Sequence, residues 1–407
     1  MINTFISTRK TVTKFVSRFD RGIWLVSLIN LLLAIGFSMC IPFLALYLHQ
    51  DRGVSMALVG IIILVAGLSS AVFELVGGEL CDRLGRRPLV LFSVISRSVV
   101  YIVMAFLVNS GAPVWSIALA FVASQALGSI GKPATQAMIT DLAPPRLLTE
   151  SFGILRIGIN VGWAAGPAIG GYLAAFMPYG WLFGVAAGIS IITAVIAFFL
   201  KESIVQKNHK TDFRGLLKVS RNVSFMLFIF FNLLFFTAMG QMMSTLSIYM
   251  VDRVGYTTAQ YGLLLTVNGL LVIILQYPIA RNIDRFSRSR VIVAGCLLYA
   301  AGYLMFGWVG SYALAVAAMV LVSFGEIAFA PAAMSVVGEI APRGEKGRYM
   351  GFFGLNQVVG ISIAPLFGGI LLDLFLTNHI AIWGIIAVSG VFGAAAFAWW
   401  ARHYKVE

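Results

Sequence analysis

Five charged residues lie inside long apolar runs of the chain, where an ionised side chain is expensive to hold. They are Glu74, Arg97, Lys132, Arg156 and Glu326. Near the middle of a bilayer each would cost at least ~2.5–3.5 kcal/mol unless it were paired or hydrated, and such residues mark ion pathways, proton relays or ligand sites. Their pattern predicts that the chain handles protons or charged ligands inside a membrane.

Two of the five are acids that could carry a proton. Glu326 has no cation among the apolar runs between residues 222 and 401. An isolated carboxylate in an apolar cavity readily takes up a proton, which makes Glu326 the first candidate carrier and Glu74 the second. The alternative is a neutral Glu326 that only forms a hydrogen bond with a neighbouring helix.

Depth along the runs predicts which charges meet. Glu74 and Arg97 both lie about 12–15 Å from the loop between them at about 1.5 Å per residue, so we expect an ion pair, either structural or part of proton coupling.

Lys132 and Arg156 are equally far from a turn near residue 144. These cations would repel unless Glu74, a substrate carboxylate or phosphate, or a lipid head group lay between them. We expect Lys132 to contact an anionic substrate or the coupling carboxylate. Alternatively, Arg156 snorkels to the membrane surface and only Lys132 faces a cavity.

The elements that carry these charges are apolar and long. The 407 residues are 60% hydrophobic and 11% charged, whereas soluble domains are about 45–50% apolar and about 25% charged. Twelve runs are long enough to cross a bilayer. They cover residues 22–47, 56–80, 88–109, 114–138, 152–176, 180–200, 222–250, 258–281, 290–309, 312–338, 350–374 and 380–401.

Basic residues are sorted between the two sides of these spans. All but five of the 29 lysines and arginines fall in the two tails and the even-numbered loops; the five are Arg52, Arg253, Arg97, Lys132 and Arg156. Because basic loops stay cytoplasmic, both termini are expected in the cytoplasm of a multi-pass plasma (inner) membrane protein. This placement accounts for the net positive charge of the chain, so we expect no nucleic-acid partner.

The polar residue types do not suggest an enzyme. The cysteines Cys40, Cys81 and Cys296 lie in or beside apolar runs and read as buried free thiols. None of the four histidines lies inside a predicted span, and no metal-ligand spacing, nucleophile–base set or nucleotide-binding loop occurs. We therefore expect no metal and no cofactor, with a proton gradient as the energy source.

The chain divides into two similar halves. Pro133, Asp141 and Ala143-Pro144 recur 198 residues later as Pro331, Glu339 and Ala341-Pro342. The predicted organisation is a cytoplasmic tail (1–21), a six-helix bundle (22–200), a cytoplasmic linker (201–221), a second bundle (222–401) and a tail (402–407). The linker mixes basic and apolar residues, which suits either a short amphipathic surface helix or a flexible segment.

The loop between the second and third runs holds a specific pattern, Gly-x-x-x-Asp-Arg-x-Gly-Arg-Arg. Its residues are Gly78, Asp82, Arg83, Gly85, Arg86 and Arg87. The arginines should face the carbonyl end of the preceding helix, Asp82 can pair with them, and both glycines leave room for another backbone. The pattern resembles the loop 2–3 signature of the major facilitator superfamily, with a generic positive cytoplasmic loop as the alternative.

This resemblance implies an all-α membrane protein of twelve transmembrane helices in two pseudo-symmetric six-helix bundles, with substrate bound between them near mid-depth. It also implies a breakable cytoplasmic gate. The gate residues would be Asp82, Arg86 and Asp141, with Asp284, Arg288 and Glu339 as a weaker counterpart. The alternative is an ordinary surface salt bridge worth ~0–1 kcal/mol.

A glycine-rich stretch in the fifth run resembles the antiporter signature of the same superfamily. It contains Gly158, Gly162, Gly166, Pro167, Gly170 and Gly171. The small residues give a flat face for close packing, and the proline bends the helix. We expect this face to roll against a helix of the other half, unless it is a static seam. The pattern is typical of exporters that exchange substrate for protons.

Family architecture places spans 1, 4, 7 and 10 around the cavity. Drug–proton antiporters usually carry an arginine four residues before a glycine in span 4, whereas Gly128 is preceded there by Ser124, and Lys132 is the expected substitute. Span 1 has no acid. The expected substrate contacts are Asn30, Asn232, Gln241, Asn268, Gln276, Phe235 and Met239. The aromatic and methionine side chains could instead face lipid or pack inside.

The resemblance as a whole implies a monomeric secondary transporter of the multidrug efflux type, which exports amphipathic small molecules in exchange for protons by alternating access while embedded in lipid. The alternative substrate is an organic anion or lyso-lipid, favoured by the excess of cations over Glu74 within the first half. A non-transporting scaffold or embedded enzyme is the alternative from another class.

Overall fold

The chain folds into long helices, and no strand occurs among the residues described by this computed structural model, which are 17–144, 147–202, 219–283, 286–342 and 346–404. Twelve spans in these residues are long and apolar enough to cross a membrane. The first half contains α2 (Arg21–Leu46), η1 (Tyr47–Asp51), α3 (Met56–Leu84), α4 (Arg86–Asn109), α5 (Val114–Ser129), α6 (Lys132–Leu142), α7 (Leu148–Phe176) and α8 (Gly180–Phe198). The second half contains α10 (Val223–Gly240), η3 (Gln241–Met243), α11 (Thr245–Ile248), η4 (Tyr249–Arg253), α12 (Thr258–Ile283), α13 (Arg288–Phe306), α14 (Tyr312–Ile340), α15 (Lys346–Leu374) and α16 (His379–Tyr404).

The twelve predicted spans are confirmed, but two of them are broken. Span 4 is divided into α5 and α6 at Ile130 and Gly131, just before Pro133, which cannot donate a backbone hydrogen bond to the preceding turn. Span 7 breaks after Gly240, and Ser244 leaves the helical region with φ −129° and ψ −64°. These breaks occur in two spans that the family resemblance places beside the central cavity.

Spans 1 and 7 end in the same way, which is a structural trace of the internal repeat. Each finishes in a π-helical turn, at Tyr47–Asp51 and at Tyr249–Arg253. Each is followed by a glycine with positive φ, 65° at Gly53 and 85° at Gly255. A side chain rarely adopts this conformation, so glycine permits the tight turn into the next span.

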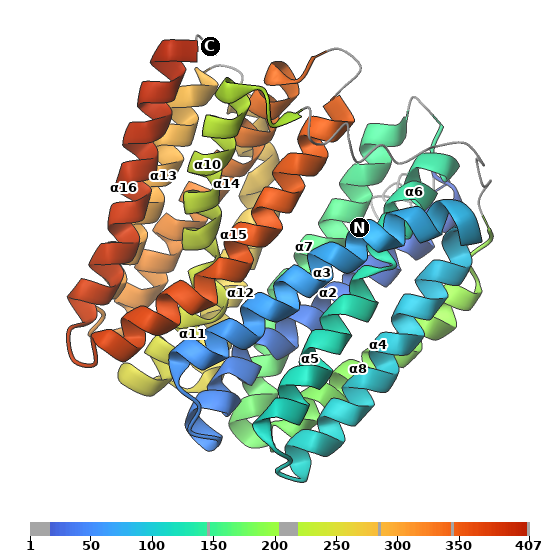
Figure 1. The fold of residues 1–407 in the computed structure, drawn as a ribbon, viewed down its shortest axis with the longest axis horizontal. Coiled ribbons are helices and arrows are strands. Elements are labelled where there is room, and N and C mark those ends of the chain that lie inside the picture. The colour runs from blue at the N-terminus through green and yellow to red at the C-terminus, as the bar shows by residue number, and fades with distance from the viewer. Residues whose placement is uncertain (1–16, 145–146, 203–218, 284–285, 343–345, 405–407) are drawn as a thin grey trace, which may run out of the picture.

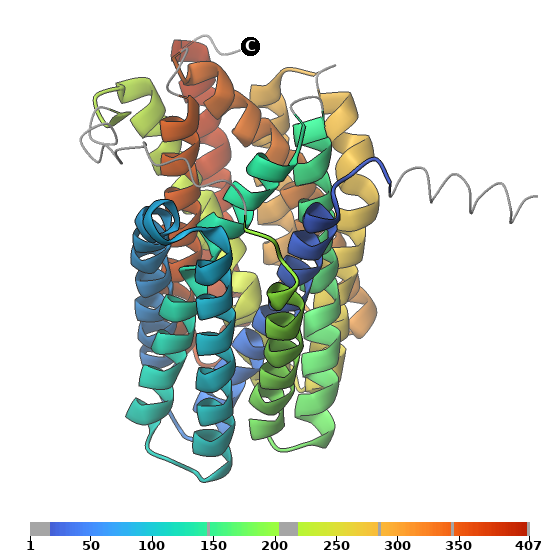
Figure 2. The same cartoon turned by 90° about the vertical axis from the view of Figure 1, so that its right-hand side faces the viewer.

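The two six-helix bundles lie side by side and meet through two pairs of helices, α3 with α15 and α7 with α12 (Figures 1 and 2). We call the end where α3 leads into α4 the basic end, and the end that holds the turns after η1 and η4 the opposite end. Close contacts join Met56 to Gly369, Gly67 to Ser362 and Gly269 to Ala164. These contacts lie toward the opposite end, and the two sets of helices diverge toward the basic end in Figure 1.

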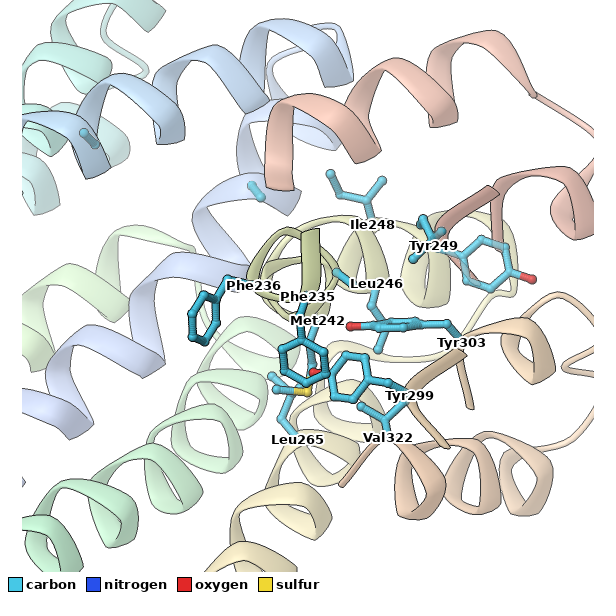
Figure 3. Packing of buried hydrophobic residues seen from close by; sticks show 14 of the residues in the cluster. Phe235, Phe236, Met242, Leu246, Ile248, Tyr249, Leu265, Tyr299, Tyr303 and Val322 are labelled. Atoms are coloured by element: carbon cyan, nitrogen blue, oxygen red, sulfur yellow. The ribbon is translucent and has the colours of Figure 1, made fainter. Parts of the chain in front are cut away.

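The second bundle has an aromatic core. Phe235 of α10 stacks on Phe329 of α14, with ring centroids 3.5 Å apart, and also contacts Tyr299 (Figure 3). Farther along, Tyr303 stacks on Trp383 at 5.5 Å. Phe235 is only 3% exposed. Neighbouring helices supply aromatic partners that cover Phe235 in this conformation, and its contact with substrate stays a prediction.

Candidate functional site

Glu326 lies on α14 and has a neutral hydrogen-bond partner in its own bundle. Asn268 of α12 donates from Nδ2 to Glu326 Oε2 at 3.1 Å and to Ser323 Oγ at 3.0 Å. In the described part of the chain no cation lies within ion-pair distance of this carboxylate. Arg156 of α7, in the other bundle, is close enough for its charge to act on Glu326. The acid therefore faces both a neutral amide and a distant cation across the bundle boundary.

Glu74 pairs with Lys132 rather than with Arg97. The Lys132 Nζ lies 2.9 Å from Glu74 Oε2, and no ion pair joins Glu74 to Arg97 within the described residues. The expected Glu74–Arg97 pair is therefore wrong. The break in span 4 explains the difference. Ile130, at the break, packs against Gly77 of α3, three residues after Glu74. Lys132 begins the helix that follows the break. Lys132 therefore has a carboxylate partner here, and its contact with an anionic substrate or the coupling carboxylate stays a prediction.

Arg97 is buried on α4 without an acidic partner among the described residues. Only 8% of this residue is exposed, and its Nε atom is buried with no hydrogen-bond partner. The guanidinium lies against Gly128 of α5, where a Cβ would overlap it. Lys132 was the expected substitute for the arginine that drug–proton antiporters carry before this glycine, and that role stays a prediction. Arg97 brings a guanidinium to this glycine from the neighbouring helix, whereas Ser124 occupies the position one turn earlier on α5.

The other predicted cavity residues divide into two groups. Asn30 and Gln276 are half-buried, and their amides donate to the carbonyls of Val26 at 2.9 Å and Ile327 at 3.4 Å. Asn232 and Gln241 are fully buried inside the second bundle. These two amides do not reach an open surface in this conformation, and Asn268 is also buried and donates to Ser323 and Glu326. Only Asn30 and Gln276 are partly exposed here. Met239 is partly covered and packs against the aromatic core.

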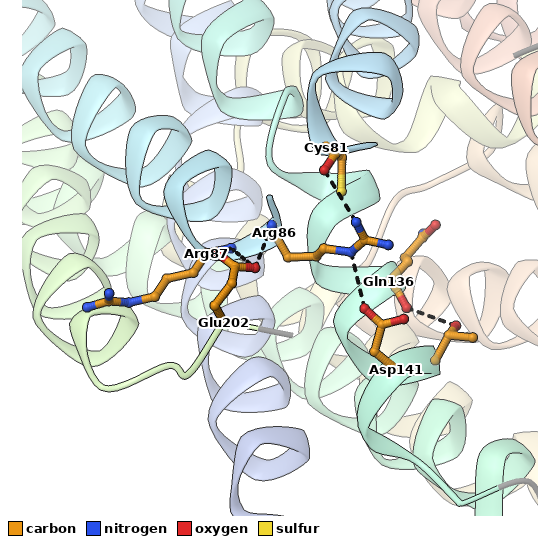
Figure 4. A network of polar contacts seen from close by, with 7 residues as sticks. Cys81, Arg86, Arg87, Gln136, Asp141 and Glu202 are labelled. Atoms are coloured by element: carbon orange, nitrogen blue, oxygen red, sulfur yellow. Dashed lines mark hydrogen bonds and ion pairs between the residues drawn. The ribbon is translucent and has the colours of Figure 1, made fainter. Parts of the chain in front are cut away.

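At the basic end the structure brings Arg86 and Asp141 together. Arg86 Nε lies 3.1 Å from Asp141 Oδ2, and its Nη1 donates to the Cys81 carbonyl at 3.4 Å (Figure 4). The second contact confirms that this arginine faces the carbonyl end of α3. Arg288 also pairs with Glu339. Each pair lies within one bundle, and its breakage during transport stays a prediction. The side chains of Asp82 and Asp284 lie outside the described residues.

Glu202 completes this network and was missed by sequence reasoning. Its carboxylate accepts hydrogen bonds from the backbone N–H groups of Arg86 at 2.8 Å and Arg87 at 3.2 Å (Figure 4). An anion at a helix N-terminus is favourable because the N–H groups there have no partner within the helix. The only signal in the sequence is an acid directly after span 6. Most of the linker that follows Glu202, including its possible amphipathic helix, lies outside the described residues.

The other residues of the loop pattern make separate contacts. Arg83 pairs with Glu79 on its own helix, with Nε 2.8 Å from Oε1, and Arg87 donates to the Phe198 carbonyl at 2.9 Å. Gly85 adopts φ 96° between α3 and α4. Gly78 has open space where a Cβ would be, whereas Gly77 closely approaches α5. The expectation of a close backbone approach at Gly78 is wrong by one residue.

The glycine-rich face of α7 packs inside its own bundle. Gly158, Gly162, Gly166 and Gly170 all lie against the backbone of α2. The opposing bundle instead meets Ala164, Pro167 and Gly171, which contact α12. The expectation that the Gly162–Gly166–Gly170 face rolls against the other half is therefore wrong. Because residues three and four apart share a helix face, Ala164, Pro167 and Gly171 form the face of α7 that contacts the other bundle.

Known proteins resemble this chain over nearly its whole length. The Na(+), Li(+), K(+)/H(+) antiporter of Planococcus maritimus is 24% identical over 365 residues, covering 81% of this chain and 85% of the relative. The multidrug resistance protein MdtH of Cronobacter sakazakii is 24% identical over 375 residues, covering 91% and 92%.

Among solved structures, a POT family transporter in complex with a thioalcohol-conjugated peptide superposes with a TM-score of 0.80 at 15% identity, covering 94% of this chain and 96% of the other. The nucleoside transporter NupG gives 0.74 at 14%, covering 93% and 100%. These structures share the fold. The family model described as Major Facilitator Superfamily matches residues 26–258 and 230–406. Together with the twelve spans in two bundles, this match shows that the chain belongs to the Major Facilitator Superfamily of membrane transporters.

Proposed function

We propose that this transporter exports amphipathic small molecules in exchange for protons by alternating access, as a monomer in the inner membrane with both termini in the cytoplasm. The names of relatives support export in exchange for protons, since they include a multidrug resistance protein and a cation/proton antiporter. The basic residues of the tails and even-numbered loops support the orientation. The energy source would be the proton gradient, without a bound cofactor.

The observation that carries the proposal is the environment of Glu326. An ionised carboxylate inside a membrane span needs a nearby cation or water, whereas a protonated one is satisfied by neutral hydrogen bonds. Asn268 supplies a neutral bond at 3.1 Å, and Arg156 acts only from the other bundle. Protonation of Glu326 would therefore switch off its attraction to Arg156. A proton would thus change the preference of one bundle for the other, which is what coupling requires.

Glu74 has a different role in this proposal. Its ion pair with Lys132 joins α3 to the second part of the broken span 4. Substitution of Glu74 would leave Lys132 without its partner and would disturb the structure near the break. We therefore assign the coupling proton to Glu326.

A second substrate class is favoured by Arg97. Lys132 is neutralised by Glu74, but Arg97 has no acidic partner among the described residues. A buried guanidinium without an anion is unfavourable, so an organic anion or lyso-lipid head group would be stabilised near it. This alternative would retain proton coupling but reverse the charge preference of the transporter.

Transport in proteoliposomes with an imposed pH gradient tests these proposals. Cationic amphipathic dyes, organic anions and K⁺ would be compared for the unmodified protein, Glu326→Gln and Glu150→Gln, whose residue forms an exposed surface pair with Arg18. We expect pH-driven dye movement that Glu150→Gln retains. Glu326→Gln should abolish this movement while downhill exchange persists. Intact gradient-driven transport by Glu326→Gln would overturn the coupling role. A preference for organic anions would select the second substrate class, and exchange of K⁺ alone would reject both.

A further inference from the structure

A histidine bridges the two bundles at the opposite end. His49 lies in the π-helical turn that ends span 1, although none of the histidines was expected within a span. Its Nε2 atom is 3.5 Å from Oδ2 of Asp252, which lies in the equivalent turn at the end of span 7. The two side chains are 23% and 29% exposed. The contact therefore joins the halves at a position that protons in the aqueous phase can reach.

The hydrogen bond at the other ring nitrogen determines whether Nε2 carries a hydrogen in the neutral imidazole. His49 Nδ1 lies 2.9 Å from the Val54 carbonyl, which can only accept a hydrogen bond, so Nδ1 carries a hydrogen. In the neutral ring, Nε2 then presents a lone pair to the Asp252 carboxylate. In the protonated ring, Nε2 donates a charge-assisted hydrogen bond to it. The contact between Nε2 and the Asp252 carboxylate is therefore repulsive when the ring is neutral and attractive when the ring is protonated.

The surrounding charges are already engaged. Arg253 approaches the same Asp252 oxygen with Nε at 3.5 Å. Arg52 donates to Tyr47 Oη and to the Ala112 carbonyl at 3.1 and 2.8 Å. Asp51 lies next to Arg52, on the same π turn as His49.

Asp373 of α15 faces α3 rather than the imidazole. It accepts the backbone N–H groups of Met56 and Ala57 at 3.3 and 3.0 Å, which is a second link between the bundles. On the α16 side, His379 packs its ring against Tyr249. Histidine is the side chain whose ordinary charge change falls between pH 5 and 8, and among these groups His49 is the imidazole that faces an acid of the other bundle.

We propose that His49 and Asp252 form a proton-operated latch that holds the opposite end closed. The latch attracts when His49 is protonated and loses its attraction when the ring is neutral. Acidic conditions would therefore favour the conformation seen here, in which the bundles touch at this end. The latch requires two alternating conformations but does not depend on Glu326 as the coupling acid. It would give the transporter a second site of response to protons, separated from the first along the membrane normal.

Distance measurements between spin labels test the latch without a membrane gradient. Labels at Ser110→Cys and Thr377→Cys, both on exposed loops at the opposite end of different bundles, would be placed in a protein whose three buried cysteines are replaced by alanine. In nanodiscs both ends experience the same pH. Between pH 8 and pH 5.5 we expect the ratio of closed to open molecules to rise about two- to fivefold, as for other partly exposed ion pairs.

Matched variants separate the latch from other pH effects. His49→Gln and Asp252→Asn should both reduce the pH response, and to the same remainder, whereas His49→Lys should favour the closed form at both pH values because its charge is permanent. His379→Gln is the control and should respond like the unmodified protein. An undiminished response in folded His49→Gln would overturn the proposal. Glu326→Gln should keep the part of the response that His49→Gln removes, so the latch and the coupling acid can fail separately.

Discussion

The seam between α7 and α12 offers a direct test of how the bundles move. Gly269 faces Ala164 so closely that a Cβ at residue 269 would lie 2.5 Å from the Ala164 Cβ and 2.6 Å from its Cα. Ordinary carbon contacts begin near 3.4 Å, so Gly269→Ala leaves the two helices about 0.9 Å too close. Ala164 cannot rotate away from this contact because the atoms involved belong to or adjoin its backbone.

The cost of that overlap can be converted to a shift in population. Overpacking by one methyl group typically costs about 1–3 kcal/mol. The strain exists only while the opposite end is closed, so it should change the ratio of closed to open molecules by about 5- to 150-fold toward open. Part of the strain can be relieved by a small separation of the helices, which would give the lower part of this range.

Spin-label distances across the opposite end, or reaction of an engineered cysteine at that end, would measure the shift. Gly184→Ala is the control, because its Cβ would meet no atom within 4 Å. The double variant Ala164→Gly with Gly269→Ala removes the contact with the Ala164 Cβ but keeps the overlap with its Cα at 2.6 Å, so it should recover only part of the original ratio. An unchanged distance distribution in Gly269→Ala would refute the view that this seam closes the opposite end by direct backbone contact.

Two further predictions concern contacts within the first bundle. Glu202→Ala should lower the free energy of unfolding by about 0.5–2 kcal/mol, because α4 loses its N-terminal acceptor at the backbone of Arg86 and Arg87; thermal unfolding in detergent measures this, and Glu202→Asp should recover part of it. Gly128→Ala should displace the Arg97 guanidinium and lower gradient-driven transport more than Gly188→Ala, whose Cβ would meet open space. Equal transport by the two alanine variants would show that the position of Arg97 is unimportant.

Hydropathy predicts the spans of this chain because each must bury its backbone in lipid over a fixed length. The predicted run 56–80 is observed as Met56–Leu84, and 312–338 as Tyr312–Ile340. The breaks at Gly131 and Ser244 were not predicted, since both lie inside runs, 114–138 and 222–250, that are long enough to be interpreted as single spans. Such breaks depend on which neighbouring helix packs at that level, as Gly77 does against Ile130.

Counting along a helix gives depth but not direction, and this limited the prediction of the site. Glu74 and Arg97 were placed at one depth, yet Lys132 takes the carboxylate because the break in span 4 turns it toward α3. Likewise, the prediction chose the Gly162–Gly166–Gly170 face of α7, whereas Ala164, Pro167 and Gly171 meet the other bundle. Glu202 could not be assigned to α4, because 116 residues separate it from Arg86 and no local pattern links them.

The two seams between the bundles use different chemistry, although the internal repeat relates them. At the α3–α15 seam, the Asp373 carboxylate holds the N-terminus of α3. At the α7–α12 seam, Thr258 and Thr266 donate to the carbonyls of Gly171 and Ala164, each at 3.1 Å. Hydroxyl-to-carbonyl bonds carry no charge that changes between pH 5 and 8. Proton sensitivity at the opposite end should therefore come from carboxylate and imidazole groups. It follows that the effect of Gly269→Ala should persist at both pH 8 and pH 5.5, whereas the effect of His49→Gln should not.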